Sequence, residues 1–299
     1  MTKEGLVPIP FRLNGETMNG FIGLVLDEHG EPRFGQTIFE FGQNVDFIDP
    51  TGVVVLSNLF EYLAKKGAGV RTRFHKPFAP MVVYLDDIGF FQRYMGSSLR
   101  SSAHRRASTV PLERVRTERM QEYLEFKLMP WVAARVGLDP ESVAGVKVCF
   151  EEILNNITDH AGVHLGCAFA QFFPKSEHIQ VAISDFGRGI PNLVRTQLPD
   201  LSDLQALQKA CEEGFTTKSN VRNRGAGLPT LMRFVTQVNR GTVLLASGSA
   251  QILAHGYHGG LRLRTHSRGF YPGTLVKVIL RTDTFEAMEA DIQAEPFQW

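Results

Sequence analysis

The stretch FEEILNNITDHAG, residues 150–162, has the pattern of the middle and end of an amphipathic helix. Asp139, Pro140 and Glu141 supply a typical start: an N-cap, a proline in the first turn and an early acid. Apolar residues then recur at spacings of three and four, which predicts one buried side of a helix. They are Val143, Val146, Val148, Phe150, Ile153, Leu154 and Ile157.

Two polar residues interrupt this apolar helix. Glu152 and Asn156 are four residues apart and therefore share a face. A carboxylate here could orient or deprotonate a nucleophile, and the amide oxygen could ligate a hard cation such as magnesium. The alternative is that both side chains are solvated or cap a neighbouring loop.

Composition restricts the class of protein. The 299 residues suffice for one large domain or two ordinary ones, and 43% hydrophobic with 21% charged residues is typical of a soluble protein. The net charge of +1 gives no electrostatic case for direct nucleic-acid or membrane binding. No apolar run is long enough for a membrane span, and Met1–Gly5 do not lead into a signal peptide. Three cysteines without a CxxC pair favour a reducing, cytoplasmic location.

The first 98 residues have the pattern of a small α/β domain. A β-hairpin is expected over residues 1–36, with a strand at Gly20–Leu26 and a turn at Asp27–Pro32. The remaining expected elements are a strand at Thr37–Phe41, a helix at Val54–Lys66, a strand at Val70–Phe74 and a short helix at Asp87–Gly96. The Ser-rich, basic residues that follow predict a linker at 99–110.

This order of elements, with Phe47-Ile48-Asp49-Pro50-Thr51-Gly52-Val53 before the helix, resembles the STAS domain of anti-anti-sigma factors. The resemblance covers about 60 residues. It implies that Thr51, the hydroxyl residue just before the glycine, is a candidate phosphoacceptor. The family more often has serine at the two positions held by Pro50 and Thr51. The alternative is that Asp49 and Thr51 cap the following helix.

A second domain is expected at residues 111–283, followed by a C-terminal tail at 284–299. Helices are predicted at Leu112–Val136, with an interruption at Pro130, and at Leu201–Glu213 and Leu228–Val238. Strands are predicted at Leu165–Phe173, His178–Ser184, Thr242–Ala246, Leu261–Thr265 and Thr274–Leu280. A turn at Pro174–Glu177 joins the first two.

A first glycine motif follows the second of these strands. Asp185 stands where the strand ends, and Gly187 and Gly189 come next. A buried carboxylate can accept a hydrogen bond from the exocyclic amine of a purine, and glycines let the backbone pass close to a flat base. The alternative is an ordinary turn.

A second glycine motif opens a helix. Residues 214–224 are polar, and Gly225 and Gly227 then precede the helix that begins near Leu228. Free N–H groups at a helix N-terminus can bind phosphate, and Lys218, Arg222 and Arg224 add positive charge. The polar stretch is interpreted as a lid over the nucleotide, or alternatively as a flexible loop.

Together, Glu-x-x-x-Asn on a helix, Asp-x-Gly-x-Gly-Ile after a strand and a lid ending in Gly-x-Gly-Leu resemble the GHKL ATPase superfamily. That group includes gyrase-type, chaperone, histidine-kinase and mismatch-repair ATPases and the anti-sigma factor serine kinases. The resemblance covers about residues 112–282. It implies the Bergerat α/β sandwich, a mixed sheet with helices on one face, and ATP between helices and lid.

By position, the resemblance implies that Glu152 activates the nucleophile, Asn156 holds Mg²⁺ and Asp185 binds the adenine amine. The remaining nucleotide contacts are implied for Gly187, Gly189, Ile190, Lys218, Arg224, Gly225, Gly227 and Leu228. Thr274 of the last strand would support Asp185. Asp159 matches the gyrase and chaperone branch, and His160 matches the anti-sigma kinases.

The leading functional hypothesis is an anti-sigma-type protein serine/threonine kinase or switch that uses Mg-ATP. In it, Glu152 acts as the base on a hydroxyl of the same chain or of another protein, and a regulatory protein partner is expected. The runner-up is an ATPase or ATP-gated conformational switch in which Glu152 activates water. An orphan histidine kinase and a nucleotide-binding scaffold without turnover are further alternatives. A homodimer is implied by family analogy.

Overall fold

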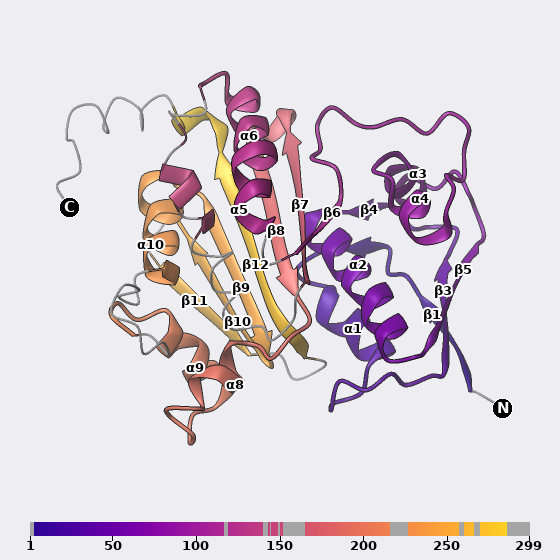
Figure 1. Cartoon of the computed structure of the whole chain (residues 1–299), viewed down its shortest axis with the longest axis horizontal. Helices are drawn as coiled ribbons and strands as arrows, with labels where there is room; N and C mark the ends of the chain where they lie inside the picture. Colours follow the sequence, from indigo (N-terminus) through magenta and orange to yellow (C-terminus); the bar gives the residue numbers. More distant parts are fainter. Residues whose placement is uncertain are drawn as a thin grey trace.

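Two β-sheets of different size, with helices between them, organise the chain (Figure 1). The computed structural model describes residues 3–116, 119–139, 143, 145–148, 150–151, 165–215, 227–256, 260–265 and 270–285. The smaller sheet belongs to residues 3–98, called here the N-terminal unit. The large sheet belongs to the remainder of the described chain. The α/β fold class expected from the sequence is confirmed.

The N-terminal unit is built on a parallel three-stranded sheet in the order β1-β3-β5. Its strands are β1 (Glu4–Pro8), β3 (Gln36–Phe41) and β5 (Gly69–Phe74), connected through α1 (Met18–Val25) and α2 (Pro50–Lys65). The two-residue strands β2 (Arg12–Leu13) and β4 (Phe47–Ile48) form a second parallel pair, and α3 (Pro80–Asp87) and α4 (Phe90–Met95) follow β5.

The expected N-terminal hairpin is wrong. β1 pairs in parallel with β3, and most of the predicted strand Gly20–Leu26 lies in α1. The β-branched and aromatic residues there favour a strand, but Met18, Phe21, Ile22 and Val25 are buried at helical spacing, so packing decides. The turn at Asp27–Pro32 is confirmed: the Asp27 carboxylate accepts hydrogen bonds from two backbone N–H groups within it.

Helix α2 begins earlier than expected, at Pro50, because Asp49 caps it. Asp49 Oδ1 accepts a hydrogen bond from the Gly52 N–H at 3.0 Å, which confirms the capping interpretation for Asp49. Gly52 is required, since a Cβ atom there would overlap the Leu13 carbonyl oxygen. Thr51 is fully buried, and its hydroxyl has no hydrogen-bond partner among the described residues.

The segment predicted as a linker is anchored to α3, a helix that the sequence analysis did not find. The expected helix Asp87–Gly96 is shorter: it is α4, which ends at Gly96 in the left-handed region. Asp86 accepts hydrogen bonds from the backbone N–H groups of Leu99 and Arg100 at 2.8 and 3.0 Å. Asp87 forms ion pairs with Arg100 and Arg106. Burial alone would raise the pKa of Asp87, but these two guanidinium groups hold it below its usual value.

The large sheet has seven strands in the order β11-β10-β9-β12-β8-β7-β6, and the pairings described are all antiparallel rather than mixed. The strands are β6 (Glu113–Arg116), β7 (Leu165–Phe173), β8 (His178–Asp185), β9 (Thr242–Gly248), β10 (Ala250–His255), β11 (Gly260–Thr265) and β12 (Tyr271–Arg281). Five strands confirm the prediction. β10 was not expected, and β6 occupies residues predicted as helix.

Helices cover one face of this sheet. They are α5 (Met120–Tyr123), α6 (Met129–Val136), α8 (Ile190–Val194), α9 (Asp203–Ala210) and α10 (Gly227–Arg233). π-helical turns at Leu124–Leu128 and Phe234–Val238 adjoin α6 and α10, and 3₁₀ turns occur at Pro174–Ser176 and Thr282–Thr284. The interruption expected at Pro130 is the first π-helical turn. Phe126 and Val148, expected on buried sides, are exposed.

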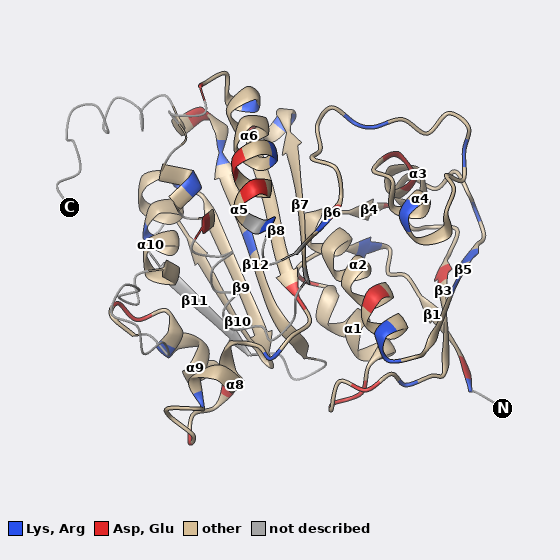
Figure 2. Cartoon of the chain, viewed as in Figure 1, with Lys and Arg blue, Asp and Glu red and all other residues tan. Residues whose placement is uncertain are grey.

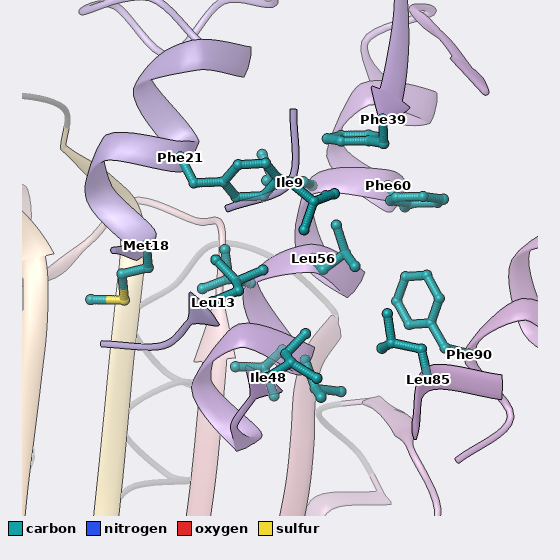
Figure 3. Packing of buried hydrophobic residues seen from close by; sticks show 14 of the residues in the cluster. Ile9, Leu13, Met18, Phe21, Phe39, Ile48, Leu56, Phe60, Leu85 and Phe90 are labelled. Atoms are coloured by element: carbon teal, nitrogen blue, oxygen red, sulfur yellow. The ribbon is translucent and has the colours of Figure 1, made fainter. Parts of the chain in front are cut away.

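The N-terminal unit covers the other face of the large sheet. Along β7, Ala168 and Ala170 pack with the helices α5, α6 and α10, whereas Cys167 and Phe169 pack with α2. Leu244 and Leu275 also join the core of the N-terminal unit, part of which Figure 3 shows around Leu56 and Phe60. The chain therefore has four layers in this order: the helices α5, α6 and α8 to α10, the large sheet, the helices α1 and α2, and the small sheet.

We expect Asp86→Ala to release the segment 99–110 because it removes the acceptor of two backbone N–H groups. Trypsin should then cleave after Arg100, Arg105 or Arg106 at least several-fold faster than in the wild type, as followed by mass spectrometry. Glu28→Ala is the matched control, since Glu28 is an exposed carboxylate whose ion pair within the described part of the chain is with the equally exposed His29. Equal cleavage rates in all three proteins would contradict the anchoring role.

Candidate functional site

Asp185 is the last residue of β8 and is completely buried. Its Oδ1 accepts a hydrogen bond from the Gly187 N–H at 2.7 Å. Its Oδ2 is buried and has no hydrogen-bond partner among the described residues. A buried carboxylate oxygen without a donor is unfavourable, so this atom is available to a donor from a ligand.

The burial of Asp185 changes its acidity. Loss of water raises its pKa to about 7, although the hydrogen bond from the Gly187 N–H and the polar backbone of the neighbouring Thr274 act in the opposite direction. A carboxyl group that titrates near neutral pH, with one unpaired oxygen, is typical of a ligand-binding or catalytic position.

Glycines allow neighbouring segments to pack closely near Asp185. Gly189 has φ +77°, and a Cβ atom there would lie 2.9 Å from Ser247 Oγ. The same Ser247 Oγ accepts a hydrogen bond from the Ile190 N–H at 3.0 Å and donates one to the Gly273 carbonyl at 2.5 Å. Ser247 thus joins the start of α8 to β12. A Cβ atom on Gly273 would overlap the Asp185 backbone, so the two segments are in close contact.

Three other predicted site residues are described. Thr274 lies directly opposite Asp185 in the β8–β12 register, as a supporting role requires. Gly227 is the first residue of α10. Leu228, expected to contact phosphate, packs its side chain in the core between the helices and the large sheet.

Thr51 lies on the other side of the large sheet from Asp185. Ala182 and Ser184 of β8 face the N-terminal unit, and Ile183 faces the helices. Because side chains alternate along a strand, Asp185 shares the face of Ile183. Thr51 belongs to α2, which packs against the opposite face.

The remaining predicted site residues lie outside the described part of the chain. They are Glu152, Asn156, Asp159, Lys218, Arg224 and Gly225. The helix that leads to Glu152 is described as far as Glu151, and its residue Phe150 is buried in the core as expected. Asn156 was the expected magnesium ligand, and the described residues hold no cluster of three or more His, Cys, Asp or Glu groups suited to a metal ion.

The sequence motifs do not include three further residues of this region. Ser184 precedes Asp185 in β8, Tyr271 forms a hydrogen bond with Ser184, and Ser247 joins α8 to β12. Ser184 lies within the predicted strand, but no motif distinguishes an isolated serine or tyrosine from ordinary strand residues. Sequence reasoning also missed Asp203, which binds Arg195 and the Ser249 N–H and so holds α9 against the β9–β10 turn.

Charges of both signs are spread over both halves of the chain (Figure 2), in keeping with the net charge of +1. Among the described helices, none combines the length and apolar character that a membrane span requires. Two open pockets of about 350 and 490 Å³, beside α10 and beside β5 respectively, do not include Asp185 in their linings.

A comparison with known protein families identifies the kind of domain to which this site belongs. Residues 116–246 match the family described as the histidine kinase-like ATPase domain. A search of curated proteins gave no significant match. The matched range runs from the end of β6 into β9 and includes Asp185, Gly187 and Gly189. The match supports an ATP-binding domain of the GHKL, histidine kinase-like type in this part of the chain.

Proposed function

We propose that the chain is an ATP-dependent regulatory protein, with serine/threonine kinase activity of the anti-sigma type toward a partner protein as its leading activity. The observation that carries the ATP assignment is the unpaired, buried Oδ2 of Asp185. The exocyclic amine of adenine is a donor that would satisfy this oxygen. Magnesium binding by Asn156 rests on the sequence motif.

The acceptor hydroxyl is proposed to lie on another protein. Thr51 is fully buried, and it lies on the opposite face of the sheet from Asp185. Phosphorylation of Thr51 would require the N-terminal unit to leave the large sheet. The STAS-like identity of that unit remains part of the proposal, supported by the Asp49-capped helix at the Asp-x-Thr-Gly turn.

A second candidate is an ATP-gated switch in which Glu152 activates water rather than a protein hydroxyl. The observation that favours it is the packing of α2 against β7 and β8, because nucleotide binding at the end of β8 can then bias the N-terminal unit. In both functions the proposed adenine contact of Asp185 is the same.

Replacing Asp185 tests the nucleotide site. Asp185→Asn should weaken ATP binding about 10- to 100-fold, because the charged acceptor of the adenine amine is lost. Isothermal titration calorimetry with Mg-ATP measures this change. Asp200→Asn, at an exposed position before α9, should bind as the wild type does. Wild-type affinity in Asp185→Asn would contradict the assignment.

The same variant tests the environment of Asp185 without any ligand. The folded-state pKa of Asp185 is about 7, whereas the unfolded value is about 3.9, so the folded state binds the proton more tightly. The wild type therefore loses stability as the pH rises from the unfolded pKa to the folded pKa. An asparagine does not titrate. The melting temperature of Asp185→Asn relative to the wild type should therefore rise between pH 5 and pH 8, by on the order of a few degrees. A difference that does not change with pH would contradict the raised pKa.

Intact-mass measurement after incubation with Mg-ATP separates the reaction classes. We expect no phosphoryl adduct on the wild type, and Thr51→Ala should be indistinguishable from it. Phosphate release that disappears in Glu152→Ala would favour the ATP-gated switch. An adduct that is lost in both variants would contradict the partner-directed proposal and establish phosphorylation of the chain's own Thr51.

A further inference from the structure

The two residues that flank Asp185 both contact helix α2 of the N-terminal unit. Ser184 Oγ accepts a hydrogen bond from Asn58 Nδ2 at 2.9 Å. The Phe186 ring meets the Tyr62 ring edge-on, with centroids 5.7 Å apart and planes at 71°. Asn58 and Tyr62 are four residues apart, so one face of α2 makes both contacts.

Tyr271 at the start of β12 completes this contact. Its hydroxyl forms a hydrogen bond with Ser184 Oγ, and its ring meets the Phe186 ring at a centroid distance of 5.4 Å and an angle of 90°. Asn58, Ser184 and Tyr271 are each at most 3% exposed. Because water cannot replace lost partners there, the geometry of this group is strongly constrained.

The contacts of Ser184 and Phe186 with α2 lie at the end of β8, where the strand pairing ends. The register between β8 and β12 ends at the pair Asp185–Thr274. On the other side of β12, its register with β9 is irregular between Tyr271 and Thr274. Phe186 is the first residue beyond β8 and has no ladder partner. Its orientation therefore depends on the rings of Tyr62 and Tyr271, which lie behind the sheet.

We propose that Asn58 and Tyr62 are positioning residues for Asp185, so that α2 sets, from behind the large sheet, where the carboxylate meets the adenine amine. The inference rests on the proposed function, since it takes Asp185 as the adenine-binding residue. A hydrogen bond weakens steeply when its angle or length departs from the optimum, so a small shift of β8 is sufficient to reduce affinity. By linkage, bound nucleotide must favour the packing of α2 to the same extent.

The test compares two nucleotides that differ only in the amine. Calorimetry with ATP and with purine riboside triphosphate, which lacks the exocyclic amine, gives both dissociation constants. Asn58→Ala should weaken ATP binding about fivefold and leave the amine-free analogue unchanged. Tyr62→Leu should behave likewise, whereas Tyr62→Phe, which keeps the ring against Phe186, should bind both nucleotides as the wild type does.

Tyr84→Phe is the matched control. It removes another hydrogen bond between the same two units, from Tyr84 Oη to Gln171 Oε1 at 2.6 Å. Gln171 pairs with Gln180, five residues before Asp185, so this variant should keep both affinities. In an Asp185→Asn background, Asn58→Ala should cause no further loss of ATP affinity.

The outcomes distinguish the two proposals. Equal weakening of both nucleotides, or unchanged ATP affinity in folded Asn58→Ala and Tyr62→Leu, would overturn the positioning role while leaving ATP binding intact. A wild type that binds neither nucleotide would overturn the proposed function itself, and the positioning role with it. If Asn58→Ala does not fold, the Leu and Phe variants of the partly buried Tyr62 decide the question.

Discussion

The burial of the large sheet on both faces is the constraint on which the rest of the structure depends. A strand in such a sheet must be apolar at successive positions, not only at alternate ones. β9 shows this directly: Val243 and Leu245 pack against the helices, while Leu244 and Ala246 pack against the N-terminal unit. One hydrophobic core contains residues of the small parallel sheet, α1 and α2 together with residues of the large sheet that are more than a hundred positions away. The two halves of the chain therefore stabilise each other.

Much of this fold could be predicted because the strongest signals are local. The turn at Pro174–Glu177 and five apolar strands of the large sheet are predicted to within a few residues. α1 was mistaken for a strand because residue preferences there conflict with the tertiary contacts of Met18 and Phe21. β6 is only four residues long, so its alternation of side chains is too short to be recognised in the sequence.

In the candidate site, too, some residues belong to a local sequence motif and others come together only through the tertiary fold. Asp185 and its glycines carry a motif, so the sequence identifies them as candidates, and their role in nucleotide binding is a proposal. The contacts of Ser247, Tyr271 and Asn58 depend on which strands become neighbours, and no local pattern contains that information. The burial of Thr51 could not be foreseen either, because a phosphoacceptor and a buried helix residue have the same sequence at that turn. The continuous apolar run of Leu165–Phe173 was the available hint that both faces of the sheet are covered.

The ion pair between Asp49 and Lys277 has a consequence for synthesis of the chain. Asp49 caps α2 with one oxygen and accepts a hydrogen bond from Lys277 Nζ of β12 with the other, at 2.8 Å. These residues are separated by 228 positions. At ribosomal rates of 5–20 residues per second, α2 therefore waits about 10 to 45 s for its partner strand. The helix cap and the ion pair of Asp49 therefore form at different times during synthesis: the cap as soon as α2 has been made, and the ion pair only when β12 follows.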